Sequence, residues 1–141
     1  MPNTDLEQAK ALLSQGICTC ALCKADVWRT SSERGVKPLL SWLDSREVLR
    51  EFSAADKVVG KAAAFLYVLL GVKQVYAPVM SRLARETLLK HGIKASYDTL
   101  TDAIRNRMDT GFCPMETAVR DIEDPSEALA AIRKKAAELS G

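Results

Sequence analysis

The sequence predicts a three-layer α/β/α domain with a mixed sheet, and three observations support this fold class. Helical and strand patterns alternate through most of the chain, which is typical of α/β folds. A β-hairpin pattern over residues 17–30 brings in antiparallel pairing and disfavours a doubly wound parallel sheet. The run from Ala54 to Leu70 is the most apolar of the chain, and it predicts a central helix beneath the sheet.

The expected central helix begins at Asp56, a good N-cap residue, and ends at Gly71. Its apolar residues recur at helical spacing and form a stripe that almost closes into a full circle. Lys57 and Lys61 nevertheless fall in its first turns, on the same face as Gly60. These two lysines on an otherwise apolar helix are the feature that most needs a functional explanation.

Caps, turns and apolar periodicity divide the rest of the chain. Thr4 and Glu7 form a capping box that opens a leading helix, which Gly16 ends. The later elements are expected in this order: strands at 17–25 and 27–30, a helix from Pro38, a brief strand at 52–55, a strand at 73–79, a helix at 81–91 capped by Ser81 with Leu83 inward, a strand at 93–97, a polar helix at 101–108, a helix from Pro114, and a last helix from Asp124 with Leu139 inward.

Composition limits the function classes. The chain has 141 residues, of which 48% are hydrophobic and 27% charged, so residues 1–141 are expected to form one domain with a substantial core. A net charge of +2, with both signs interspersed, does not indicate a nucleic-acid binder. No apolar run is long enough for a membrane span, and the N-terminus carries acids where a signal peptide has bases. We therefore expect a cytoplasmic protein that binds neither membrane nor nucleic acid.

Four strings of the sequence are similar to those of one family. They are residues 33–40 (ERGVKPLL), 55–64 (ADKVVGKAAA), 75–81 (VYAPVMS), and 106–116, which ends in TGFCPME. Together they resemble an uncharacterised prokaryotic family, a domain of unknown function, whose fold is similar to that of cytidine deaminases. The resemblance implies that fold and no established activity. The zinc motifs of true deaminases are missing, because the corresponding helix starts contain Asp56-Lys57-Val58 and Pro78-Val79-Met80.

The start of the central helix is the first candidate site. Free backbone N–H groups and two lysines there would favour an anionic group such as phosphate or carboxylate. Asp56, Lys57, Gly60 and Lys61 are the expected ligand-binding residues. The alternative is that the lysines pair with acidic side chains of the chain or extend into water. Four further residues could extend the same anion-facing cleft, or else belong to a solvated surface: Arg34, Lys37, Thr110 and Gly111.

Cys113 and Glu116 form the second candidate site. Cys113 precedes Pro114, so its thiol would lie at the N-cap of a helix, a position that favours a reactive thiolate. Glu116 could then move a proton as a catalytic partner. The competing interpretation is structural, with Glu116 completing a capping box and Cys113 as a small residue at a helix start. Whether the protein is an enzyme is left open by these patterns.

The remaining cysteines, Cys18, Cys20 and Cys23, are interpreted as buried reduced thiols, with a zinc site as the weaker alternative. On a strand, Cys18 and Cys20 would share one face and Cys23 would lie on the other. A fourth zinc ligand would have to come from a distant part of the chain. No metal or cofactor is therefore expected.

These observations favour a small-molecule-binding domain of unknown activity, whose ligand is nucleotide-like or otherwise anionic. The alternative is a non-catalytic module that self-associates as a homo-oligomer. Trp28, Trp42 and Tyr67 would then supply the apolar anchors of the interface.

Overall fold

The computed structural model describes residues 4–33, 35–46, 49–102 and 113–140. Their elements follow in this order: α1 (Asp5–Ser14), β1 (Cys20–Lys24), β2 (Val27–Ser31), α2 (Lys37–Asp44), β3 (Ser53–Asp56), β4 (Val58–Val59), α3 (Lys61–Leu70), β5 (Gln74–Ser81), α4 (Arg82–Lys90), β6 (Lys94–Thr101), α5 (Pro114–Val119) and α6 (Pro125–Ser140). The prediction of an α/β domain with both a hairpin and parallel strands is confirmed.

The sheet is mixed. β1 pairs antiparallel with both β2 and β3, whereas β3, β5 and β6 run parallel to one another. β4 also pairs in parallel with β5, and both β3 and β4 align with β5 residues 21 positions further along the chain. Because the register is unchanged, β3 and β4 are one strand interrupted at Lys57.

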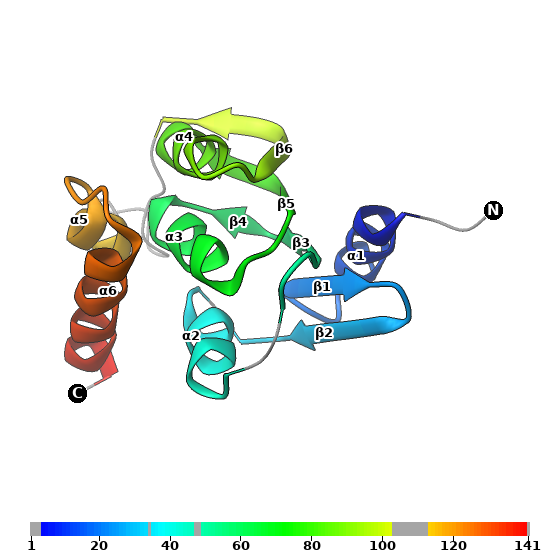
Figure 1. Cartoon of the computed structure of the whole chain (residues 1–141), viewed down its shortest axis with the longest axis horizontal. Helices are drawn as coiled ribbons and strands as arrows, with labels where there is room; N and C mark the ends of the chain where they lie inside the picture. Colours follow the sequence, from blue (N-terminus) through cyan, green and yellow to red (C-terminus); the bar gives the residue numbers. More distant parts are fainter. Residues whose placement is uncertain (1–3, 34, 47–48, 103–112, 141) are drawn as a thin grey trace.

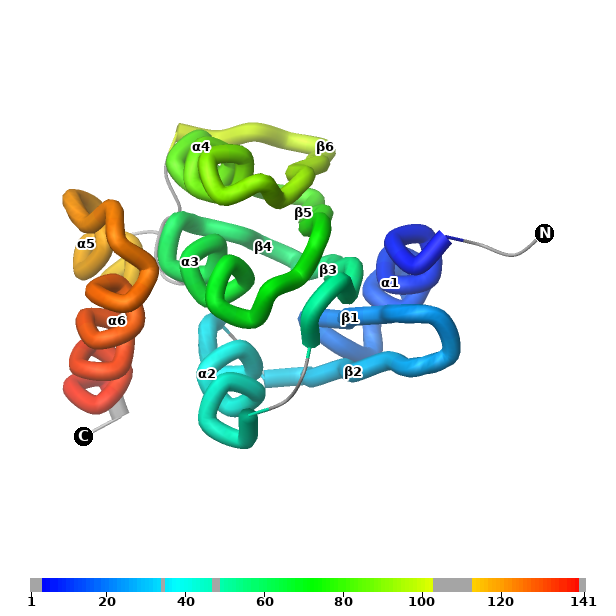
Figure 2. The backbone as a smooth tube through the Cα atoms, in the orientation of Figure 1, coloured from blue at the N-terminus to red at the C-terminus, as the bar shows by residue number. Residues whose placement is uncertain are grey.

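Helices lie on both faces of this sheet (Figures 1 and 2). On one face, Ala9 and Leu13 of α1 pack in a small cluster with Ala55 and Tyr76. The larger core lies on the other face, where α3 packs between the sheet and the helices α2, α4, α5 and α6. Figure 1 shows α5 and α6 side by side, on the opposite side of the molecule from α1. The result is the expected three-layer arrangement, with a single described helix in the layer formed by α1.

The central helix begins later than predicted. Asp56 ends strand β3 and is not an N-cap, and α3 begins at Lys61 with Gly60 as its N-cap residue. Lys57 lies in the strand interruption and Lys61 in the helix, so the two lysines do not share a helical face. The reason is that a run of alanines and valines fits a buried strand as well as a helix, and periodicity cannot separate the two.

Other differences are local. Thr101, expected to open a polar helix, ends strand β6, and the rest of that helix from residue 103 onward lies outside the described residues. Leu83 and Leu139, expected to face the core, are 39% and 59% exposed. Among the confirmed features are the cap at Thr4, which accepts a hydrogen bond from the Glu7 backbone, and the cap at Ser81, which accepts one from Ala84.

The three cysteines near the first hairpin are buried, as predicted, but their faces differ from the expectation. Cys20 packs in the core on the α3 side, whereas Cys18 and Cys23 belong to the cluster beneath α1. Cys18 precedes β1, so the strict alternation assumed for a strand does not extend to it. In the described part of the chain, no group of three or more His, Cys, Asp or Glu side chains is placed to hold a metal ion. None of the described helices is both long and apolar enough to cross a membrane.

Candidate functional site

The N-terminus of α3 binds a carboxylate that belongs to the chain itself. The backbone N–H groups of Lys61 and Ala62 donate hydrogen bonds to the two oxygens of Glu116, at 2.6 Å and 3.0 Å. Burial raises the pKa of Glu116, and the two backbone hydrogen bonds and Lys61 oppose that rise. Glu116 therefore occupies the position at which the sequence predicted the anion of a ligand.

Gly60 makes this contact sterically feasible. A Cβ atom at residue 60 would lie 2.4 Å from the Glu116 carboxyl carbon and 2.5 Å from each of its oxygens. The backbone φ of Gly60 is −102°, a value that any residue can adopt, so the space for Glu116 and not the backbone conformation requires glycine here.

Lys61 is a buried cation with partners inside the chain. Its side chain is 4% exposed, and its ammonium donates to the Arg120 carbonyl at 2.8 Å and to the Glu123 carboxylate at 3.2 Å. Lys90 holds the other oxygen of Glu123 at 3.1 Å. Hydrogen bonds from Lys90 and Lys61 lower the pKa of Glu123. Lys61 thus connects α3 to the segment between α5 and α6, as the alternative interpretation of paired lysines had anticipated.

Asp56 and Lys57 extend to opposite sides of the sheet. The Asp56 carboxylate lies in the core, where it accepts a hydrogen bond from the Tyr67 hydroxyl at 2.8 Å. Lys57 is exposed and lines a cavity between the sheet and α1. The structure therefore separates the four residues that the sequence had grouped into one ligand site.

The other predicted site residues are dispersed or undescribed. Cys113 is half-buried at the N-cap of α5, where its side chain makes no capping hydrogen bond. The expected capping box within α5 is not formed, because Glu116 caps α3 instead. Lys37 is exposed at the start of α2. Arg34, Thr110 and Gly111 lie outside the described residues.

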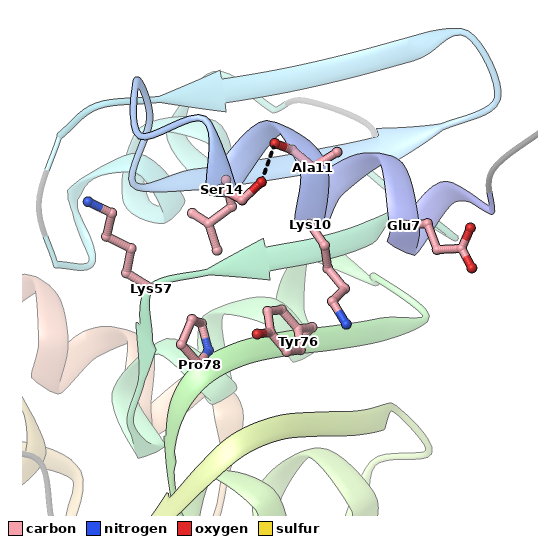
Figure 3. A pocket seen from close by; sticks show the side chains of 8 residues that line it. Glu7, Lys10, Ala11, Ser14, Lys57, Tyr76 and Pro78 are labelled. Carbon is pink, nitrogen blue, oxygen red and sulfur yellow. Dashed lines mark hydrogen bonds between the residues drawn. The ribbon is translucent and has the colours of Figure 1, made fainter.

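The cavity beside Lys57, hereafter the α1 pocket, has a volume of about 670 Å³. Its lining combines one face of α1 with the residue that follows β3 and the middle of β5, and consists of Glu7, Lys10, Ala11, Leu13, Ser14, Lys57, Tyr76 and Pro78. Figure 3 shows Lys10 reaching from α1 onto Tyr76, while Lys57 extends on the side of the pocket near Ser14. Two ammonium groups and one carboxylate give the pocket a positive balance.

Tyr76 forms a fixed aromatic wall of the α1 pocket. Its hydroxyl donates to Asp98 of β6 at 2.6 Å, and the Lys10 ammonium lies 4.1 Å from the centre of its ring. Burial, followed by the hydrogen bond to Asp98, raises the pKa of Tyr76 to about 12, so the hydroxyl stays protonated at neutral pH. The pocket therefore offers an aromatic ring held in place, with the Lys10 ammonium over it.

The sequence analysis missed Lys10, Ser14 and Tyr76. One signal was present, because Glu7, Lys10, Ala11 and Ser14 follow the i, i+3, i+4, i+7 pattern and therefore share one face of a helix. That this face meets Tyr76 and Lys57 follows from tertiary packing, which the spacing does not reveal.

Comparison with known proteins gives a family and a fold. The family described as "TM1506: Domain of unknown function (DUF1893)" matches residues 8–136. The crystal structure of a DUF1893 family protein (TM1506) from Thermotoga maritima at 2.70 Å resolution is similar to this structure, with a TM-score of 0.84 and 24% sequence identity over 96% of this chain and 92% of that chain. No curated protein matches the chain.

Proposed function

Because the chain belongs to the DUF1893 family of unknown function, we propose a function from the geometry alone: it is a small-molecule-binding domain whose α1 pocket takes an anionic, nucleotide-like ligand. The observation that carries this proposal is the meeting of Lys10, Lys57 and the Tyr76 ring around one cavity. A negatively charged group would lie between the ammonium groups, and a planar or apolar part would lie against Tyr76 and Pro78.

The size of the α1 pocket fits this class of ligand. Its volume of about 670 Å³ lies within the range of small-molecule pockets, which is about 300–1,000 Å³. Lys57 is the one member of the originally predicted anion site that lines it. By contrast, the backbone donors at the start of α3 already hold Glu116, and Lys61 already holds Glu123. The α1 pocket is therefore a better place for an external anion than the start of α3.

A thermal-shift screen of nucleotides and phosphorylated metabolites tests the proposal, since a ligand that binds only the folded state raises the melting temperature. We expect at least one anion to stabilise the wild type and to lose that effect in a Lys10→Ala, Lys57→Ala double variant. Lys134→Ala is a control for the loss of one positive charge elsewhere, because Lys134 lies on the exposed surface of α6, and each single variant, Lys10→Ala and Lys57→Ala, is compared with it. If every anion shifts the wild type and the double variant equally, the α1 pocket is not an anion site.

Self-association remains a second proposal because Trp28 is 55% exposed on strand β2. Of the other anchors suggested by the sequence, Tyr67 is wholly buried and Trp42 packs against the core, so Trp28 alone is left for this role. Light scattering of the wild type and of a Trp28→Ala variant over a range of concentrations tests this proposal. A wild-type mass that rises with concentration, and that does not rise in the variant, would support self-association through Trp28. A wild type that stays monomeric at high concentration would contradict it. The cytidine-deaminase-like fold, the cytoplasmic location and a catalytic use of Cys113 also stay predictions of the sequence.

A further inference from the structure

The ring of Tyr76 lines the α1 pocket but offers little of its surface to a ligand. Tyr76 belongs to the cluster beneath α1 and is only 8% exposed. The Lys10 ammonium lies over the ring, 4.1 Å from its centre. A planar group can stack on an aromatic ring only where a face of that ring is open to it. Such a group therefore has to take the place of Lys10 on the ring.

Lys10 is the movable partner in this contact. The Tyr76 hydroxyl donates to Asp98 of β6 at 2.6 Å, so the ring is tied to both β5 and β6. Lys10 is exposed and reaches the ring from α1 through a flexible four-carbon stem (Figure 3). No ion pair among the described residues engages its ammonium, although the carboxylate of Glu7 also lines the pocket. Lys10 can therefore leave the ring by giving up one cation–π contact.

An anion in the pocket changes the preferred position of the Lys10 ammonium. Without a ligand, the ammonium is attracted by the electron-rich face of the Tyr76 ring. A phosphate or carboxylate group attracts it more strongly, because such a group carries a full negative charge. Lys57 lines the same pocket but extends away from the ring (Figure 3), so its contact with an anion does not uncover Tyr76. Of the two lysines, Lys10 is therefore the one that links the anionic part of a ligand to the ring.

We propose that Lys10 is a gate that makes the α1 pocket selective for ligands that carry an anionic group and a planar group together. The anionic group draws the ammonium off the ring, and the planar group stacks on the face that is uncovered. A nucleoside without a phosphate has to displace Lys10 unaided, and a phosphate without a base leaves the uncovered ring unused. This gate rests on the proposed function of the α1 pocket, and it explains why both halves of a nucleotide are needed there.

The cover over the ring is tested without any ligand. A soluble paramagnetic agent broadens the NMR signals of the protons that it can approach, so it measures how open the Tyr76 ring is to solvent. The broadening of the ring signals should increase in Lys10→Ala and stay unchanged in Lys134→Ala, which removes a charge from the exposed surface of α6. Alanine is a strong helix former, so α1 is kept. Equal broadening in the wild type and in Lys10→Ala would overturn the gate.

Adenosine and AMP test the selectivity, because stacking accepts any base. Titration calorimetry compares their affinities for the wild type, Lys10→Ala and Lys57→Ala. Lys10→Ala should strengthen adenosine binding about two- to fivefold, which is the usual strength of an exposed cation–π contact. Lys57→Ala should leave adenosine binding unchanged and weaken AMP binding. The gate thus predicts that removing a cation improves the binding of a neutral ligand, which a simple anion site does not predict.

Failure of the gate and failure of the anion site give different results. If Lys57→Ala weakens AMP binding but Lys10→Ala does not improve adenosine binding, the gate is overturned and the proposed function stands. If Lys57→Ala leaves the affinity for AMP unchanged, the anion site itself is contradicted, and the selectivity is contradicted with it.

Discussion

Replacing Gly60 with alanine tests how the start of α3 is stabilised. The added Cβ would lie 2.4 Å from the Glu116 carboxyl carbon, closer than two such atoms can approach. The backbone at Gly60 has φ −102°, so alanine introduces no backbone strain of its own. The variant must therefore displace the Glu116 carboxylate and break its hydrogen bonds to Lys61 and Ala62.

The expected cost follows from the value of a helix cap. Losing a side-chain cap costs about 0.5–2 kcal/mol, and Glu116 makes two charge-assisted bonds, so we expect a loss near the upper end, about 2 kcal/mol. Glu116→Ala should cost a similar amount because it removes the same two bonds. The double variant should lose little more than either single variant, which gives a coupling energy of about 1.5 kcal/mol. Urea unfolding of the four proteins measures all three quantities.

Additive losses would refute this account of α3. If Gly60→Ala and Glu116→Ala destabilised independently, the carboxylate would not depend on the space that glycine leaves. Glu116→Gln serves as the matched control, because it keeps the length of the side chain and replaces one acceptor oxygen with a donor. It should lose about half of the capping energy, since one of the two backbone N–H groups then lacks an acceptor.

Three further predictions concern the core and the thiols. Because burial raises the pKa of Asp56 from 3.8 to about 7, the folded state holds a proton that the unfolded state releases, so the free energy of unfolding should fall by up to about 4 kcal/mol as the pH rises from 4 to 7. In urea unfolding across pH, Asp56→Asn should remove this decline, and a decline that persists would assign it to other groups. Lys61→Met keeps an apolar stem but removes the hydrogen bond of the buried ammonium to the Arg120 carbonyl, so a loss of about 1–3 kcal/mol is expected from calorimetry, and an unchanged stability would contradict the anchoring role. Iodoacetamide followed by mass spectrometry should label half-buried Cys113 in the native protein and spare the three buried thiols, Cys18, Cys20 and Cys23, and the reverse order would contradict the described burial.

Much of the fold could be predicted from local signals. Thr4, Ser81 and the Cys113-Pro114 pair mark helix starts, and each starts a helix in the structure. These signals are reliable because capping depends on residues close together in the sequence. The start of the central helix was misplaced because Ala54, Ala55, Val58 and Val59 carry no periodicity that distinguishes a buried strand from a helix. Their strand conformation is stabilised by pairing with β1 and β5, which only the tertiary structure supplies.

The candidate sites were harder to predict, because each one joins distant parts of the chain. Glu116 caps a helix that begins 55 residues earlier. The α1 pocket brings together Lys10 of a helix, Lys57 of the strand interruption and Tyr76 of β5. No local spacing indicates such contacts. Sequence reasoning therefore recognised charged candidates such as Lys57 and Glu116 but did not predict which residues lie next to them in the fold.

The start of α3, where the sequence predicted a bound anion, is occupied by the Glu116 carboxylate of the chain itself. The unpaired N–H groups of a helix require an acceptor, and this requirement could be predicted from Lys61 and its neighbours. A carboxylate on the same chain meets it at an effective concentration that a free metabolite must exceed before it can displace Glu116. Lys57 is different, because it is exposed and lines the same cavity as Lys10. Among the described residues no ion pair engages Lys10 or Lys57, whereas the start of α3 already holds the Glu116 carboxylate, and this difference supports the α1 pocket as the proposed ligand site.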